Sequence, residues 1–162
     1  NMFWEPAAPE RIAMVGTAFQ SIGLGWHSVA GAARANPEAT IVLTTGDGGG
    51  VMALSDLDTA IRSAGGRGMA VVFNDAAYSA EVHLYGRKGL ATPPMLIDEI
   101  DFAALATAAG AQGVVVRSLA DLDVVAEWAA APVEQRQFLV LDLRVSGTVV
   151  APYQEEIIRV NS

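Results

Sequence analysis

Two apolar stretches, each followed at once by glycine or polar residues, constrain the fold of this chain more than any other feature. Residues 40–44 run into Gly46-Asp47-Gly48, and residues 69–73 run into Asn74. The segment between them, 51–63, has the amphipathic pattern and the length of a helix. The sequence therefore predicts a strand, turn, helix, strand unit. In a parallel sheet both turns lie at the carboxyl edge, where open α/β sheets bind ligands.

The rest of the chain continues this alternation of strands and helices. Further strands are predicted at 113–116 and 138–145, and helices at 22–35, 80–85, 101–110 and 119–130. Ser21 is expected to cap the first of these helices, and Ser118 with Asp121 to cap the last. Alternating β and α units predict an α/β fold in three layers, helix, parallel sheet, helix. Residues 1–162 are expected to form a single domain, with residues 1–20 as an irregular lead-in.

The composition excludes several classes of function. The formal net charge of −8 argues against nucleic acid or an anionic membrane surface as a partner. The sequence contains no cysteine, which excludes thiol catalysis, thiolate metal sites and disulfides. No apolar run reaches the roughly 20 residues of a membrane span, and the start has no signal-peptide pattern. These features predict a cytoplasmic protein.

The two turns place oxygen ligands and glycines together at one edge of the sheet. Asp47 offers a carboxylate and Asn74 an amide oxygen, and these suit a hard cation such as Mg²⁺. Gly48 and Gly49 have no side chains, so their backbone N–H groups can approach a phosphate group. The simpler interpretation of Asp47 alone is an ordinary aspartate in a glycine-rich turn.

The spacing of these residues resembles a known family. Gly46-Asp47-Gly48, followed after 25 residues by Asn74, is similar to the diphosphate-binding motif of thiamine-diphosphate-dependent enzymes. Residues 19–25 and 101–106 resemble flanking segments of the acetolactate-synthase and benzoylformate-decarboxylase-like group. The resemblance covers the C-terminal, diphosphate-binding domain only. It implies the thiamine-diphosphate-binding fold, with thiamine diphosphate and Mg²⁺ as cofactors.

The resemblance also implies roles for individual residues. The expected metal ligands are Asp47, Asn74 and the main-chain carbonyl of Ala76. Ile22 matches the bulky apolar residue that separates the two rings of the cofactor. Its N–H and the carbonyl of Gln20 would then face the aminopyrimidine. The implied cofactor-binding residues are Gln20, Ile22, Gly46, Asp47, Gly48, Gly49, Asn74, Ala76 and Tyr78.

The family also requires a glutamate that activates the pyrimidine ring, and no residue of this chain matches it. That glutamate belongs to a separate pyrimidine-binding domain, so the chain is interpreted as half of an active site and as a C-terminal fragment of a longer protein. We expect pairing with such a domain and a homodimer or larger oligomer. The aromatic residues expected around the cofactor cleft are Phe3, Trp4, Phe19 and Trp26, and Trp4 and Trp26 are interpreted as packing or interface residues.

Three side chains are candidates for proton transfer, although no catalytic residue is assigned. Glu81 and His83 lie in the segment that follows the metal motif, and His27 lies in the first helix. The alternative for Glu81 and His83 is the solvated face of a surface helix. The alternative for His27 is an ordinary residue near a helix N-terminus.

The leading functional hypothesis is the diphosphate-binding part of a decarboxylase or carboligase that acts on a small 2-oxo acid. The enzyme would be an acetolactate-synthase-like lyase or transferase, incomplete without its partner domain. One alternative is a stand-alone subunit of a two-chain decarboxylase. Others are a non-catalytic nucleotide- or phosphate-binding α/β module and a degenerate structural domain. The glycine pattern lacks the third glycine of a dinucleotide-binding fingerprint, which disfavours the nucleotide module.

Overall fold

A four-stranded parallel sheet forms the centre of the molecule in the computed structural model, which describes residues 9–15, 21–150 and 152–160. The strand order is β1-β2-β4-β3, and every neighbouring pair is parallel. The predicted fold class and the four predicted strands are therefore confirmed. The strands are β1 (Ile41–Gly46), β2 (Gly68–Asn74), β3 (Gln112–Val116) and β4 (Leu139–Arg144).

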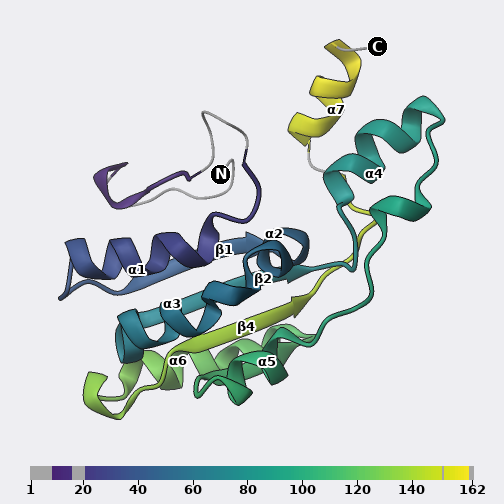
Figure 1. Cartoon of the computed structure of the whole chain (residues 1–162). Coiled ribbons are helices and arrows are strands. Elements are labelled where there is room, and N and C mark those ends of the chain that lie inside the picture. The colour runs from purple at the N-terminus through teal and green to yellow at the C-terminus, as the bar shows by residue number, and fades with distance from the viewer. Residues whose placement is uncertain (1–8, 16–20, 151, 161–162) are drawn as a thin grey trace.

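Short helices connect the strands, and most of them lie against the sheet (Figure 1). The α-helices are α1 (Gly25–Ala35), α2 (Asp47–Met52), α3 (Leu57–Ala64), α4 (Ser79–Tyr85), α5 (Phe102–Ala108), α6 (Asp123–Ala130) and α7 (Pro152–Val160). The 3₁₀ segments are η1 (Pro9–Arg11), η2 (Leu54–Asp56), η3 (Gly65–Arg67), η4 (Gly86–Lys88), η5 (Pro93–Met95), η6 (Leu119–Leu122) and η7 (Val133–Gln135). None of the described helices is long and apolar enough to cross a membrane.

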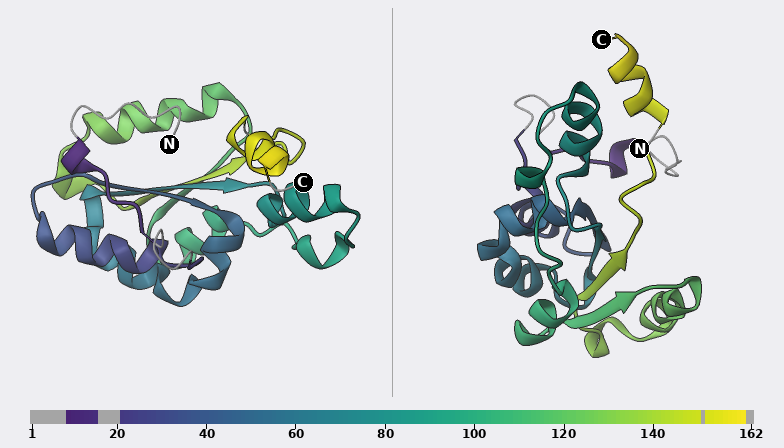
Figure 2. Two further views of the ribbon diagram at one scale, coloured as in Figure 1. Left: turned by 90° about the horizontal axis from the view of Figure 1, so that it is seen from above. Right: turned by 90° about the vertical axis from the view of Figure 1, so that its right-hand side faces the viewer.

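The helices divide into two layers around the sheet. Helices α1, α3 and α5 cover one face, and α6 covers the other (Figure 2, left). On the first face Trp26 and Phe102 are fully buried and pack in one cluster with Val72 and Val140. On the second face Trp128 of α6 packs on β4. Both layers bury apolar side chains on a sheet that is itself apolar on both faces, as parallel sheets require.

The two central strands are the most deeply buried strands of the sheet. β2 and β4 have neighbours on both sides, and their apolar runs are buried almost throughout. β1 lies at the edge, and its residues alternate between half-buried and exposed. The central position of β2 and β4 matters for the site because it buries the polar residues Asn74 and Asp142 within the same sheet.

Two helix predictions are wrong at their starts. The first helix begins at Gly25 with Leu24 as its N-cap, not at Ile22 with Ser21 as the cap. Gly23 has a φ of +92°, so the chain turns sharply there before the helix begins. The predicted helix 119–130 has its first turn in the 3₁₀ form, η6, and α6 follows. The capping box of Ser118 and Asp121 is confirmed.

The predicted helix 51–63 is also wrong in its extent. The helical backbone begins at Asp47, four residues earlier, so the three glycines are part of α2 and not of a loop. The helix then breaks at Ala53, and the chain passes through η2 into α3. Glycine is a poor helix former, and the contacts described below explain why these positions are helical despite it.

The carboxyl edge of the sheet is extended by two helices. α4 and α7 stand beyond the strand ends (Figure 1, and Figure 2, left), and α7 packs against α4. His83 Nε2 lies 2.9 Å from the carbonyl oxygen of Gly147, which joins α4 to the segment before α7. α4 agrees with the predicted short helix, but α7 was not predicted. Because α7 packs against α4, the C-terminal segment supports that helix.

Candidate functional site

The predicted meeting of two turns at one sheet edge is present in the structure. Gly46 ends β1 opposite Phe73 of β2, so Asp47 and Asn74 follow at the same level of the sheet. Both side chains are only 3% exposed. Two buried polar side chains thus follow neighbouring strand ends at one edge of the sheet, and buried polar groups need partners.

The Asp47 carboxylate is held by backbone N–H groups. Oδ1 accepts a hydrogen bond of 2.9 Å from Gly48 N, and Oδ2 accepts one of 2.8 Å from Ala76 N. Burial raises the pKa of the Asp47 carboxyl, and these N–H groups oppose that effect while the nearby Asp75 carboxylate adds to it. The charged form is therefore costly in this position. A bound cation would offset that cost.

Asn74 presents an oxygen that has no partner. Its Nδ2 donates to the Ile100 carbonyl at 2.8 Å and to Asp142 Oδ1 at 2.9 Å. Its Oδ1 is buried and accepts no hydrogen bond from the residues that the structure describes. An orphaned buried acceptor is unusual in a folded protein and requires an explanation. A cation ligand beside Asp47 is the explanation that the neighbouring carboxylate supports.

Ala76, the third expected ligand, has an unusual backbone. Its φ of +59° is rare for a residue other than glycine. The turn brings its N–H to Asp47, while its carbonyl oxygen accepts a hydrogen bond of 3.0 Å from Ile97 N. A carbonyl oxygen has two lone pairs, so one is left for a cation. The metal role of Ala76 stays a prediction.

The protein offers few charged ligands at this edge. Among the described residues, no group of three or more His, Asp or Glu side chains is placed to hold a metal ion. Asp47 is the one charged group in the expected ligand set. Mg²⁺ commonly completes its coordination with water and with phosphate oxygens of a bound molecule. The donor set therefore fits a cation that arrives with a phosphorylated cofactor.

The glycines of α2 allow two aromatic rings to approach the backbone. A Cβ on Gly48 would lie 2.5 Å from Tyr78 Cε1, and a Cβ on Gly50 would lie 3.0 Å from Phe102 Cε1. A larger residue at Gly48 would displace Tyr78. These contacts explain why poor helix formers occupy this turn, since packing decides the conformation here. They also bring Tyr78 next to Asp47.

Trp26 holds the same turn from the other side. It is 1% exposed, and its Nε1 donates to the Gly50 carbonyl at 3.0 Å. Of the two interpretations of Trp26, packing is confirmed and exposure at an interface is wrong, because the ring belongs to the core. Phe3, Trp4 and Phe19, predicted with it, lie outside the described residues.

Replacing Trp26 with phenylalanine is expected to destabilise the domain by about 1–3 kcal/mol, because the buried Gly50 carbonyl loses its donor. Urea unfolding measures this change. Trp128→Phe is a matched control, since Trp128 Nε1 donates to the Gln137 carbonyl at 2.8 Å, far from α2. Only Trp26→Phe should shift the amide resonances of residues 48–50. Equal shifts in both variants would contradict this role for Trp26.

An open cleft of about 270 Å³ lies beside the buried pair. It is lined by Ile22, Met52, Tyr78, Glu81, Pro94 and Met95. The sequence predicted Ile22, Tyr78 and Glu81 near the cofactor, and the structure brings these three together. Met52, Pro94 and Met95 were missed as lining residues, since nothing local marks them. The fold brings them together, with Gly23 packed on Met52 and η5 returning to Tyr78.

Two of the other candidates lie elsewhere. His27 is half exposed on α1, and its Nδ1 lies 2.8 Å from Asp56 Oδ2, so it does not line the cleft. His83 is tied to Gly147 and also lies outside the cleft lining. Gln20 is outside the described residues. Among the proton-transfer candidates only Glu81 faces the cleft.

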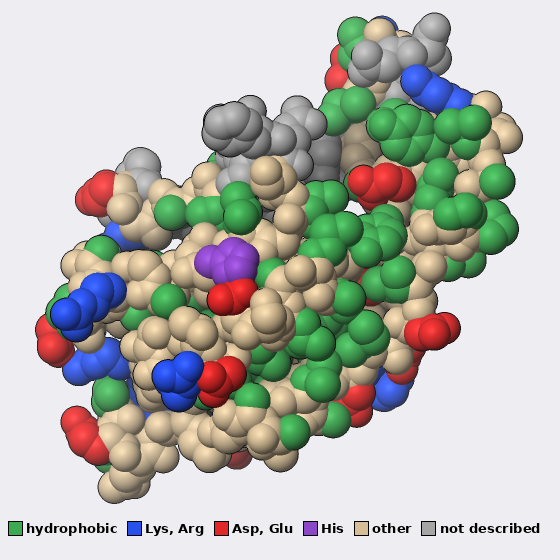
Figure 3. Space-filling model, in the orientation of Figure 1, with side chains coloured by type: hydrophobic (Ala, Val, Ile, Leu, Met, Phe, Trp, Pro, Cys, Tyr) green, Lys and Arg blue, Asp and Glu red, His purple; other side chains and the backbone are tan. Residues whose placement is uncertain are grey.

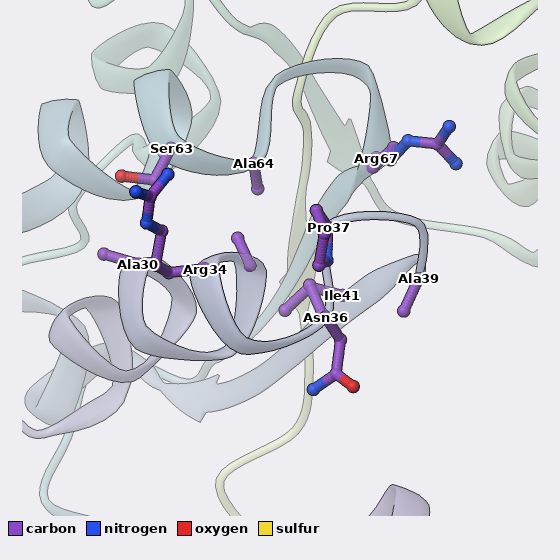
Figure 4. A pocket seen from close by; sticks show the side chains of 10 residues that line it. Ala30, Arg34, Asn36, Pro37, Ala39, Ile41, Ser63, Ala64 and Arg67 are labelled. Atoms are coloured by element: carbon purple, nitrogen blue, oxygen red, sulfur yellow. The ribbon is translucent and has the colours of Figure 1, made fainter.

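A larger pocket of about 350 Å³ lies at the opposite, amino edge of the sheet (Figure 4). It lies between the end of α1, the start of β1 and the end of α3, and alanines and Pro37 form much of its lining. The Arg67 guanidinium is already bound to Glu38, at 2.8 Å. The buried pair of Asp47 and Asn74 is at the other edge, so size does not identify the functional site.

The sequence matches one protein family over most of its length. Residues 2–143 match the family described as thiamine pyrophosphate enzyme, C-terminal TPP binding domain. The chain belongs to this family. No curated protein sequence gives a significant match.

A solved structure supports the same fold. The crystal structure of benzoylformate decarboxylase from Polynucleobacter necessarius superposes with a TM-score of 0.66 at 17% sequence identity. The match covers 80% of this chain and 24% of that chain. This chain therefore corresponds to about a quarter of that enzyme. At this identity the likeness shows the fold of a thiamine-diphosphate-binding domain.

Proposed function

We propose that this domain binds the diphosphate group of thiamine diphosphate through Mg²⁺, as part of an enzyme that decarboxylates or joins 2-oxo acids. The observation that carries the proposal is the unpaired, buried Oδ1 of Asn74 at the same edge of the sheet as the buried Asp47 carboxylate. A hard cation satisfies both groups at once. Family membership supports thiamine diphosphate as the molecule that brings the phosphate oxygens.

The residues around the pair have distinct roles in this proposal. Asp47 and Asn74 hold the cation, with the Ala76 carbonyl as third ligand. The backbone at Gly46, Gly48 and Gly49 faces the diphosphate. Gly49 lies against Ile22, since an added Cβ would be 3.5 Å from Ile22 Cγ2 and 3.3 Å from Thr45 Oγ1. The cation site and the apolar cleft are therefore adjacent, as one extended cofactor requires.

The cleft is proposed to hold the organic part of the cofactor. Ile22 is 53% exposed although it is strongly apolar, which suits a residue that wedges between two rings. Met52 and Tyr78 provide further apolar surface. When bound, thiamine diphosphate supplies a nucleophilic carbon that adds to the carbonyl group of a 2-oxo acid. Glu81 is the proposed proton-transfer residue on this side of the cleft.

The domain is proposed to work with a pyrimidine-binding domain that carries the activating glutamate, in a homodimer or larger assembly. Hydrophobic side chains gather around α4 and the loop after it (Figure 3). Ile22, Met52 and Leu96 are each more than half exposed in this region. Apolar patches of this kind mark association surfaces. A partner domain would cover them and complete the cleft.

The acetolactate-synthase-like activity, the lyase or transferase class and the identity of the 2-oxo acid are parts of this proposal. A stand-alone subunit of a two-chain decarboxylase would use the same residues in the same way. A phosphate-binding module without chemistry would leave the position of Ile22 unexplained. The cytoplasmic location stays a prediction from the sequence.

A titration followed by ¹H–¹⁵N NMR tests the proposed binding on the 162-residue chain, since NMR detects weak complexes. Thiamine diphosphate with Mg²⁺ is expected to shift the amide resonances of Gly46, Gly48 and Gly49 and the side-chain amide of Asn74. The cation bridges protein and diphosphate, so thiamine without its diphosphate should cause no such shifts. Removal of Mg²⁺ with a chelator should reverse them.

ADP with Mg²⁺ serves as the competing ligand in the same titration. Shifts at these residues with ADP and not with thiamine diphosphate would replace the proposal with the nucleotide-binding alternative. Shifts with thiamine diphosphate that persist without Mg²⁺ would contradict the metal-mediated binding.

A further inference from the structure

Asp142 is a completely buried carboxylate that sequence analysis did not single out. It lies in the central strand β4 opposite Val72 of β2, two residues before Asn74. Alternate residues of a strand point to the same face, so Asp142 and Asn74 lie on one face of the sheet. A charged group in this position requires partners, and their arrangement indicates its role.

Both oxygens of Asp142 are engaged. Oδ1 accepts from Asn74 Nδ2 at 2.9 Å, and Oδ2 accepts from Phe102 N at 2.9 Å and from Arg144 Nη2 at 2.8 Å. The Arg144 side chain is 9% exposed and also reaches Glu99 at 2.9 Å. The guanidinium therefore balances the buried negative charge. Each oxygen of Asp142 is therefore held by at least one donor among the described residues.

These contacts fix the orientation of the Asn74 amide. Its two polar neighbours on this side, the Ile100 carbonyl and the Asp142 carboxylate, are both acceptors. Only the nitrogen end of the amide can face them, because the oxygen end would meet two oxygens. The remaining end is Oδ1, which is the unpaired atom at the edge of the sheet where Asp47 also lies.

We propose that Asp142 is a positioning residue that sets Asn74 with its oxygen directed at the metal site, without being a ligand itself. The inference rests on the proposed function, because it gives the freed oxygen a cation to bind. Partners of this kind, which orient a metal ligand, typically change metal affinity by about 10–100-fold when they are altered. The proposal also explains why β4 carries a buried aspartate within an otherwise apolar strand.

The substitution Asp142→Asn keeps the size of the side chain and inverts the pattern of donors. Phe102 N and Arg144 still donate to one end, so the oxygen of the new amide faces them. Its nitrogen then faces Asn74 Nδ2, so two hydrogen-bond donors meet and no bond forms between them. The Asn74 amide should turn over and direct its nitrogen at the cation. The expected result is a loss of about 10–100-fold in Mn²⁺ affinity with thiamine diphosphate present, measured by electron paramagnetic resonance.

A double variant separates positioning from general support of the fold. In Asn74→Asp with Asp142→Asn, the new carboxylate can accept from the new amide and still direct its other oxygen at the cation. We expect it to recover about tenfold of the lost Mn²⁺ affinity. Failure of the double variant to bind better than Asp142→Asn would overturn the proposal. Asp121→Asn, a half-buried aspartate in the capping box before α6, is the matched control and should leave Mn²⁺ affinity unchanged.

A measurement on the unaltered chain covers the case in which Asp142→Asn does not fold. Addition of Mg²⁺ and thiamine diphosphate should shift the Asn74 side-chain carbonyl carbon in NMR spectra, while its NH₂ protons stay protected from exchange with solvent. Rapid exchange of those protons would contradict the hydrogen bonds that orient the amide. Absence of any binding by the unaltered chain would instead contradict the proposed function, so the two failures are distinguishable.

Discussion

Replacing Asp47 with alanine is expected to abolish Mg²⁺-dependent binding of thiamine diphosphate when the chain is assembled with its pyrimidine-binding partner. Asp47 is the one charged group in the proposed ligand set, and its carboxylate is buried at the start of α2. Without it the cation would be held by neutral oxygens alone, which cannot balance its charge in a buried site. The loss should exceed the roughly 100-fold expected for groups that only orient a ligand. Isothermal titration calorimetry measures it directly.

Asp75→Ala is the control for this substitution. Asp75 is a neighbouring aspartate that accepts a hydrogen bond from Ser79 at 2.5 Å, and it is not a proposed ligand. Its removal takes a negative charge away from the proposed diphosphate position, so affinity should be retained or improved. Binding by Asp47→Ala that equals binding by the unaltered protein would refute the metal assignment. Circular dichroism of each variant establishes that the fold is intact.

The isolated chain is expected not to accelerate hydrogen–deuterium exchange at C2 of thiamine diphosphate, even with Mg²⁺ present. Activation of that carbon needs a proton-transfer group at the pyrimidine ring, and no residue of this sequence matches the glutamate that supplies it. Among the residues that line the described cleft, Glu81 is the one carboxylate. It lies on α4, the helix that follows the turn at residues 74–78. Proton NMR of quenched samples in D₂O gives the exchange rate.

Addition of a pyrimidine-binding domain that carries the glutamate should raise the exchange rate, and the same domain with glutamine in that position should not. If the chain alone accelerated the exchange, the half-site interpretation would be wrong. Glu81→Gln would then identify the acceptor, because Glu81 faces the cleft whereas His27 is paired with Asp56 outside it. His83 is held by Gly147 and is the less favoured candidate.

Much of the fold could be predicted because local signals agreed with each other. The runs 40–44 and 69–73 are apolar, end in turn residues, and are separated by one helical segment. Parallel connection of such units places their ends at one edge, and the register of Gly46 with Phe73 confirms it. The start of α5 at Asp101 and the capping box at Ser118 were predicted for the same reason, since caps act within one turn.

The errors lie where packing from a distant segment overrides local preference. Gly48 and Gly50 were predicted to lie in a glycine-rich turn before the helix, yet Tyr78 and Phe102 pack on them and the backbone is helical. This helix, α2, ends before Ala53 for no reason visible in its own sequence. α7 was missed because its apolar residues are few, and contact with α4 supports it.

The sequence by itself determined that Asp47 and Asn74 lie at the carboxyl edge of a parallel sheet, because the parallel direction of the strands and the positions of the turns follow from the alternation of strands and helices along the chain. Only the tertiary structure decided which end of the Asn74 amide faces the site. That orientation depends on Asp142, 68 positions further along the chain, and on the carbonyl of Ile100. Hydrogen bonds between residues so far apart leave no mark in a local pattern, and they form only when β4 is inserted beside β2.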